Sequence, residues 1–271
     1  MFSTKMRISI YVIVFFACIL TLFPVTWALY NSFLAEGEIL GRKILSLSLS
    51  GENYQKIMET KTYLNTIKNS AITSSLATLI SIVVGALGAY GLIRLRRGEK
   101  TFAFFLLIFR MLPGLILIIP FYVMFRVMNL LDTYWALILM YLTLGLPFAT
   151  WMLRGFFMGI PREIMEAARI DGCSEIKIFW RIVFPITRPG IWATAIITYL
   201  FCWNDFLYAL IVTDRKALTF LPFLTRFLLP TRILYGPIYA GTMFFIFPVL
   251  IALILVRKYL TEKFALGLIP K

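Results

Sequence analysis

Six long apolar stretches constrain the fold of this chain more than any other feature of its sequence. They lie at residues 8–30, 71–93, 101–127, 133–153, 189–212 and 238–256. A helix needs about 20 apolar residues to cross a hydrocarbon core of about 30 Å, and it satisfies its own backbone hydrogen bonds there. The stretches are too long and continuous for the strands of a membrane barrel. The sequence therefore predicts an all-α integral membrane protein with six transmembrane helices in a single transmembrane domain, residues 1–271.

Charge is distributed unevenly among the segments that join these stretches. The chain has 27 lysines and arginines against 13 acids, and 61% of its residues are hydrophobic. Basic residues gather before the first stretch, at 94–100, at 154–188 and after the last stretch. Because cytoplasmic loops carry an excess of lysine and arginine, we expect both termini and the polar loop (residues 154–188) in the cytoplasm, and loop 31–70 outside. No small-residue cleavage site follows the first stretch, so we expect a retained span rather than a signal peptide.

The polar loop is predicted to fold as a helix, a glycine turn and a second helix. Pro161 suits the first turn of a helix and Gly172 suits the left-handed position after a helix end, so residues 161–171 are expected to be helical. Ser174 is placed to cap the second helix, and Pro185 is expected to end it. Apolar residues recur in this second helix at helical spacing. They are Ile176, Phe179, Trp180, Val183 and Phe184.

The first helix of the polar loop is built for docking, because two alanines leave room for another surface to approach. The series Glu166-Ala167-Ala168, Asp171-Gly172 and Pro185 resembles the EAA motif of permeases in ATP-binding cassette importers, in particular the sugar-uptake group of the maltose-permease kind. The resemblance implies that this helix couples the permease to a separate ATPase. The implied ATPase-coupling residues are Glu166, Ala167, Ala168, Arg169, Asp171 and Gly172. A DNA-binding helix-turn-helix has a similar outline, but it is not expected between two membrane spans.

Other positions add to this resemblance. Asn53-Tyr54 in loop 31–70 and Asn69-Ser70 before the second span are similar to pairs in sugar permeases, as is the series Trp203 to Phe206 in the fifth span. By their chemistry alone, Asn69 and Ser70 are predicted helix caps with no further role. Loop 31–70 is expected to hold one or two amphipathic surface helices, and loop 213–237 a short surface or re-entrant helix.

Polar and helix-breaking residues in the third and fifth spans indicate a route through the membrane, since such residues are costly unless they face a cavity. Hydroxyl-rich sugars are held by hydrogen bonds and aromatic faces. The candidate pathway-lining residues are Pro113, Gly114, Tyr122, Trp203, Asn204 and Asp205. Pro120 is expected to interrupt the third span further, and Arg110 to face protein or a wet vestibule. Asp205 has three open readings: a pathway residue, a partner of a buried cation, or an interfacial group.

The sequence lacks the residues expected of a catalytic, metal-binding or nucleotide-binding site. The chain contains no histidine, and its three cysteines are scattered without the spacing of a disulfide or metal site. Residues 98–101 read GEKT but lack the glycines of a phosphate-binding P-loop. We therefore expect a transporter subunit that is not an enzyme, with no catalytic residue, metal or cofactor of its own. ATP and Mg²⁺ are then bound by the partner ATPase.

The resemblance also implies an assembly. It is that of a MetI-like permease bundle with a cytoplasmic coupling-helix loop, in a prokaryotic inner membrane. Its implied partners are a second related permease subunit, two ATP-binding cassette ATPase subunits, an extracytoplasmic solute-binding protein, a carbohydrate substrate and membrane lipid, but no nucleic acid. Gly267 fits the glycine-containing tail of such permeases, while Pro270-Lys271 departs from it.

Three other functions compete with the sugar permease. The first is a polyamine or other small-solute ABC permease. The second is a stand-alone channel or ion-coupled carrier, which requires charged relays in the membrane, for which only Arg110 and Asp205 are candidates. The third is a membrane enzyme, for which no catalytic set is evident.

Overall fold

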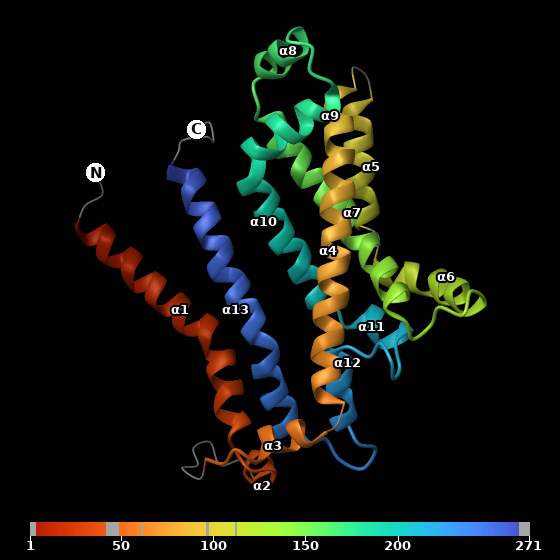
Figure 1. Cartoon of the computed structure of the whole chain (residues 1–271). Helices are drawn as coiled ribbons and strands as arrows, with labels where there is room; N and C mark the ends of the chain where they lie inside the picture. The colour runs from red at the N-terminus through yellow and green to blue at the C-terminus, as the bar shows by residue number, and fades with distance from the viewer. Residues whose placement is uncertain (1–3, 42–48, 61, 96–97, 112, 266–271) are drawn as a thin grey trace. The chain divides into compact units, whose positions relative to one another are not determined.

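The chain is helical throughout the part that the structure, a computed structural model, describes (residues 4–41, 49–60, 62–95, 98–111 and 113–265). This part holds no strand, only an isolated β-bridge between Leu228 and Ile233. The predicted all-α class is confirmed (Figure 1). The elements are α1 Thr4–Ser32, α2 Glu36–Leu40, α3 Glu52–Glu59, α4 Tyr63–Arg94, α5 Glu99–Met111, α6 Gly114–Val127, α7 Tyr134–Met158, α8 Arg162–Ile170, α9 Glu175–Ile178, the π-helical turn η1 Phe179–Val183, α10 Phe184–Trp203, α11 Leu207–Val212, α12 Phe220–Leu224, the 3₁₀ turn η2 Thr225–Phe227 and α13 Tyr235–Ala265.

The long helices overlap the six predicted spans, but not all of them meet the length and composition of a membrane crossing. Three helices do so in the described part of the chain: Ser9–Ser32 within α1, α4 and α7. A fourth span results if α5 and α6, which are bent by 82° relative to each other, are counted together. The predicted spans at 189–212 and 238–256 fall on α10 with α11 and on α13.

The chain divides into two compact units, residues 1–64 with 223–247 and residues 65–222 with 248–271. In the first unit, Asn53 of α3 ties the end of α1 in place. Its side-chain nitrogen donates to the carbonyls of Ser32, at 3.0 Å, and Leu34, at 2.7 Å. The Glu36 carboxylate accepts from the first backbone N–H groups of α13, at 2.8 and 3.1 Å, where an acid is favourable for the helix dipole. Loop 31–70 thus contains the short helices that were predicted, but α4 begins eight residues before the predicted start of the second span.

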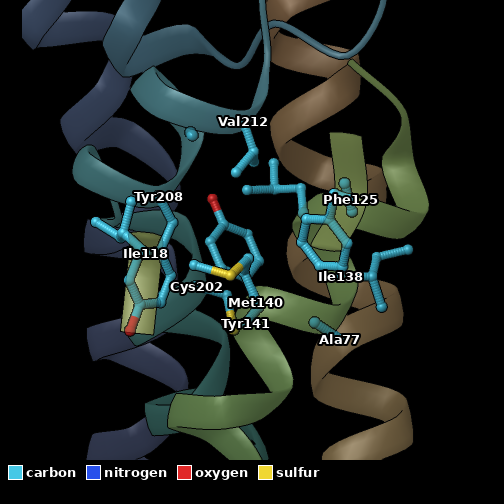
Figure 2. Packing of buried hydrophobic residues seen from close by; sticks show 12 residues of the cluster. Ala77, Ile118, Phe125, Ile138, Met140, Tyr141, Cys202, Tyr208 and Val212 are labelled. Atoms are coloured by element: carbon cyan, nitrogen blue, oxygen red, sulfur yellow. The ribbon is translucent and has the colours of Figure 1, made fainter. Parts of the chain in front are cut away.

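The second unit has two apolar cores. One joins α4, α6, α7, α10 and α11 around the buried side chains of Phe125 and Tyr141 (Figure 2). The other joins the opposite part of α4 and α7 to α8, α9 and η1 around Phe157 and Phe179. Because lipid tails are as apolar as these side chains, close packing rather than burial from water favours such contacts in a membrane.

The helix α4 approaches α7 closely at two of its glycines. A Cβ at Gly85 would lie 3.0 Å from the Cβ of Ala149 and 3.1 Å from the backbone nitrogen of Thr150, both on α7. A Cβ at Gly88 would lie 3.4 Å from the Thr150 side chain, whereas one at Gly91 would meet nothing within 4 Å. The glycine series therefore packs against α7 along one part of its length only.

Proline and polar residues break the helices at other points than predicted. The third span breaks at Pro113 and Gly114 as expected, but Pro120 lies inside α6, which continues through it. The fifth span was predicted as one helix containing Asn204 and Asp205, and this was wrong. α10 ends at Trp203, and α11 begins only at Leu207, because the Asp205 carboxylate accepts from backbone N–H groups at the start of α11. The predictions on the Arg110 side chain and on residues 266–271 lie outside the described residues.

Replacement of Gly85 by valine should destabilise the protein, whereas the same replacement at Gly91 should not. Valine at Gly85 forces α4 and α7 apart, for which overpacking costs about 1–3 kcal/mol. Thermal unfolding in lipid nanodiscs measures the difference. Equal unfolding temperatures for Gly85→Val and Gly91→Val would contradict the close approach of the two helices.

Candidate functional site

The polar loop folds as α8, a glycine turn and α9, as predicted. Pro161 directly precedes α8 rather than lying in its first turn. At the other end, Gly172 has φ of +77°, a left-handed conformation that glycine adopts without strain. The Gly172 N–H donates to the Arg169 carbonyl and the Cys173 N–H to the Ala168 carbonyl, which is the Schellman arrangement that closes a helix. The sequence thus fixes both the length of α8 and the direction in which the chain leaves it.

The two faces of α8 have different surroundings. Met165 and Ala168 are buried in the second unit's core beside Phe157 and Ile160. Glu166 and Ala167 are exposed, as are Arg169, Asp171 and Gly172 beyond them. Of the alanine pair that was predicted to leave room for another surface, Ala168 therefore packs on the chain's own core, while Ala167 lies on the outward face.

Three isoleucines are exposed on the same segment. Ile164 is 42% exposed, Ile170 87% and Ile176 74%. Large apolar side chains presented next to charges on a polar loop are typical of a surface that another protein covers. The polar loop thus offers an outward face of mixed apolar and charged character, fixed from behind by the core.

The second helix of the polar loop does not end at Pro185, contrary to prediction. α9 continues through the π-helical turn η1 into α10, and the Phe184 N–H donates to the Phe179 carbonyl five residues before it. Pro185, which has no N–H to donate, lies in the first turn of α10 directly after the π-helical turn. The wider turn also shifts the apolar stripe, so that Phe179 and Val183 are buried, while Ile176 and Trp180 are exposed. Ser174 precedes α9 but its hydroxyl makes no capping bond.

A carboxylate joins the polar loop to α4. Glu175 Oε2 accepts from the Tyr90 hydroxyl at 2.6 Å, and Glu175 Oε1 lies 3.0 Å from Arg94 Nη2 and 2.9 Å from Arg169 Nε. Burial alone raises the pKa of Glu175. The hydrogen bonds from Tyr90 and Arg169 and the charge of Arg94 outweigh this effect, so the pKa lies below its ordinary value. Glu175 is therefore ionised throughout the neutral range. The contact of Glu175 with Tyr90 and Arg94 was missed in the sequence, because nothing local shows that α4 returns to the polar loop.

The N-terminal part of α4 binds the segment that follows α11 (Figure 1). The Asn69 side-chain nitrogen donates to the carbonyls of Lys216, at 3.0 Å, and Leu218, at 2.8 Å, and its oxygen accepts from the Tyr134 hydroxyl at 2.7 Å. The Ser70 hydroxyl accepts from the Phe220 N–H at 2.9 Å. Asn69 and Ser70 were predicted to be helix caps, and this was wrong. Both are buried residues within α4 that hold a distant loop in place.

Asp132 completes this attachment from the turn between α6 and α7. Its carboxylate accepts from the backbone N–H groups of residues 214, 215, 216 and 217 at 2.9–3.2 Å. Burial raises the pKa of Asp132, but these backbone donors lower it to below its ordinary value. The loop clamp, defined as Asn69, Ser70 and Asp132, therefore holds residues 214–220 with side chains from two separate parts of the chain.

The candidate pathway residues lie on several helices. Pro113 and Asn204 are exposed, Gly114, Tyr122 and Asp205 are half-buried, and Trp203 is buried. A Cβ at Gly114 would lie 2.8 Å from the Tyr208 hydroxyl, so the break in the third span meets α11 directly. Asn204 donates to the Leu200 carbonyl at 2.7 Å, and the Asp205 carboxylate accepts from Ala209 N–H at 3.1 Å. The structure therefore brings the two broken spans together at Gly114.

An apolar groove of about 880 Å³ lies elsewhere, along α4 and α10 and beside Pro248 and Ile251. Its lining includes Trp180 of η1 and Trp192 and Tyr199 of α10. Arg188 is the one charged residue among the described residues that line it. A polar solute finds few hydrogen-bonding groups along this surface.

Comparison with known proteins gives a consistent result. A family profile described as "Binding-protein-dependent transport system inner membrane component" matches residues 78–261. The probable ABC transporter permease protein YurM of Bacillus subtilis is 30% identical over 262 residues, covering 96% of this chain and 87% of its own length. The trehalose/maltose transport system permease protein MalG of Thermococcus litoralis is 29% identical, covering 92% and 91%. A crystal structure of a bacterial ABC transporter involved in alginate import contains a chain with a TM-score of 0.76 at 19% identity, covering 96% of this chain and 99% of that one.

Loss of the Asp132 carboxylate should release the loop that it holds. Asp132→Ala removes the acceptor of four backbone N–H groups, and we expect a loss of about 2 kcal/mol in stability, since hydrogen bonds to charged groups are worth about 1.5–3 kcal/mol. Asp214→Ala is the matched control, because that side chain is 81% exposed and pairs only loosely with Arg215. Hydrogen exchange of residues 214–217 should accelerate in the first variant alone. Equal exchange in both variants would show that Asp132 does not hold the loop.

Proposed function

Because the chain belongs to the family of inner membrane components of binding-protein-dependent transport systems, we propose that it forms, with a second permease, the path of an ATP-driven importer for a carbohydrate. Membership makes the chain a permease subunit of an ABC importer, a multi-pass protein of the inner membrane. Such subunits have no nucleotide-binding site, and ATP is bound by a separate ATPase. What is proposed beyond this is the role of α8, the topology, the partners and the solute.

We propose that α8 is the helix on which the ATPase docks. The observation that carries this proposal is the contrast between its faces: Met165 and Ala168 are held in the core, while Glu166, Ala167 and the neighbouring isoleucines are presented outward. The ATPase-coupling set Glu166, Ala167, Ala168, Arg169, Asp171 and Gly172 is assigned on this basis. Within it, Ala168 fixes the helix from behind, and the exposed members face the partner.

We further propose that the whole chain is a single permease domain with six spans. Four are provided by α1, α4, the bent pair α5–α6 and α7, and two by the broken helix α10–α11 and by α13. The termini and the polar loop then lie in the cytoplasm, in agreement with the concentration of basic residues in the polar loop. In this orientation the loop clamp lies on the outer side, where a solute-binding protein approaches.

The proposed partners are a second related permease, two ATPase subunits and an extracytoplasmic binding protein. In support, a transporter whose permease chain has the same fold, with a TM-score of 0.70, is described in complex with an alginate pentasaccharide-bound periplasmic protein. The exposure of α1 also favours a second permease. Its membrane-spanning segment is 0% buried within this chain, so its apolar surface is left to lipid or to another subunit.

The solute is proposed to be a carbohydrate. Relatives at about 30% identity include a trehalose/maltose permease and a diacetylchitobiose uptake permease from Streptomyces coelicolor, which is 28% identical. The candidate path of Pro113, Gly114, Tyr122, Trp203, Asn204 and Asp205 offers amide and aromatic groups suited to hydroxyls. A polyamine is the second candidate, but it requires free carboxylates, and the Asp205 carboxylate is already engaged by backbone N–H groups of α11. That engagement favours a neutral solute.

The docking proposal predicts that Gly172→Val uncouples the ATPase while Gly172→Asn does not. No atom lies within 4 Å of the position of a Cβ at Gly172, so both side chains fit, and only the backbone conformation distinguishes them. A β-branched residue at φ of +77° costs about 1–2 kcal/mol, whereas asparagine tolerates this region. The amount of ATPase that co-purifies with the chain, and its ATP hydrolysis, are the measurements.

Undiminished ATPase co-purification and hydrolysis in Gly172→Val would refute the docking role. The same experiment tests the orientation, because an ATPase can reach α8 only from the cytoplasm.

The substrate proposal predicts that Asn204→Ala lowers carbohydrate uptake. Loss of one hydrogen bond of about 1 kcal/mol corresponds to a decrease of about fivefold. Uptake of labelled trehalose and maltose is measured against spermidine, with the amount of co-purified ATPase as the control for assembly. Uptake of spermidine alone would favour the polyamine permease, and undiminished sugar uptake would remove Asn204 from the path.

A further inference from the structure

Besides the apolar packing of the second core, the polar loop and α4 are joined by the carboxylate of Glu175. Apart from Glu175, α8 is held to the core by two buried side chains, Met165 and Ala168, on a helix of nine residues. Apolar contacts of this kind are non-directional and allow a short helix to pivot. A docking helix that pivots passes only part of its displacement to α4. Something directional must therefore fix α8 relative to α4.

We propose that Glu175 is a positioning residue that fastens the docking helix α8 to the membrane-spanning helix α4, so that the two move together when the ATPase moves α8. The proposal rests on the proposed docking function of α8. Glu175 itself is on neither helix. It begins α9, directly after the turn at Gly172, and reaches Arg169 on α8 with one oxygen and Tyr90 on α4 with the other.

The geometry explains why a carboxylate is required there. Arg94 and Arg169 both approach Glu175 Oε1, at 3.0 and 2.9 Å, so this oxygen neutralises two cations from two different helices. Without it the two guanidinium groups repel each other, and the contact becomes unfavourable. The Arg94 guanidinium also lies 5.8 Å from the centre of the Tyr90 ring, and that ring packs 5.3 Å from Phe179. Both partners on α4 are thereby oriented toward Glu175.

The strength of these ion pairs shows whether Glu175 mainly stabilises the protein or mainly positions α8. The side chains of Arg94, Arg169 and Glu175 are 44%, 40% and 30% exposed, so water and salt screen their attraction. Such a contact adds little to the stability of the whole protein. It does impose a direction, because the Tyr90 hydrogen bond and two ion pairs fix the carboxylate from three sides. Loss of Glu175 should therefore change the position of α8 without unfolding the chain.

The test is a distance measurement between two spin labels. In a background without Cys18, Cys173 and Cys202, labels are placed at Arg162 in the first turn of α8 and at Leu87 on α4, both exposed. The full chain is studied in nanodiscs with its co-purified ATPase, nucleotide-free and trapped with ADP and vanadate. We expect one narrow distance distribution that does not shift on trapping, because α8 and α4 move as a unit.

Glu175→Gln keeps the size of the side chain and its bond to Tyr90 but loses both ion pairs. We expect the distribution to become about twofold wider and to shift on trapping. Arg94→Gln should act in the same direction, and the double variant should add nothing, as expected for residues of one contact. Glu163→Gln, an exposed acid in the first turn of α8, is the matched control and should match the unmutated protein. Unfolding temperatures should be unchanged throughout.

An unchanged distribution in nucleotide-free Glu175→Gln would overturn the proposal, and so would a wider distribution that does not shift on trapping. Failure of the docking function is a separate result. If no ATPase co-purifies even with the unmutated chain, the docking function of α8 fails, while the nucleotide-free distance still reports whether Glu175 fastens α8.

Discussion

Backbone polar groups in the hydrocarbon layer must find partners within the protein, and the arrangement of this chain follows from that requirement. Regular helices satisfy it along most of the length. Where a helix breaks, a local group takes over: the Ile116 N–H donates to the Pro113 carbonyl after the first break, and the Asp205 carboxylate accepts from the start of α11 after the second. Buried threonines such as Thr194 and Thr198 likewise donate to carbonyls four residues earlier. At both of these breaks, a carbonyl or a carboxylate thus accepts from a backbone N–H group that the break leaves free.

The helix α4 connects the polar loop with the loop clamp because it has no such break. Its 32 residues run from Tyr63 to Arg94, and about 1.5 Å of rise per residue makes it roughly 48 Å long. Asn69 and Ser70 near one end bind the loop after α11, and Tyr90 and Arg94 at the other end bind Glu175. An unbroken helix bends little, so the polar loop and the loop clamp are mechanically related through it.

Local sequence signals predicted what depends on local geometry. Gly172 correctly predicted a left-handed turn, and Pro113 with Gly114 correctly predicted the break in the third span. Both effects involve only neighbouring residues. Asn69 and Asp132 were not understood, since their partners lie about 80 to 150 residues away. The prediction that Pro185 ends the second helix of the polar loop failed for a related reason. A π-helical turn, which the tertiary packing of Phe179 supports, allows the helix to continue. The helix, turn and helix of the polar loop could therefore be predicted from the sequence, whereas the distant contacts that hold this loop could not.

The two ends of α4 differ in the strength of their attachments. At the loop clamp the bonds of Asn69 and Ser70 are buried, and each hydrogen bond left unmade there costs about 1–3 kcal/mol. At Glu175 the ion pairs are partly exposed, and pairs of that kind contribute about 0–1 kcal/mol. The loop clamp is therefore the stronger attachment, whereas the Glu175 contact acts through the direction that it imposes on α8. Under the proposed docking of the ATPase on α8, we expect α8 and α4 to move together and the loop held by the clamp to follow α4, because the buried bonds of Asn69 and Ser70 are costly to break.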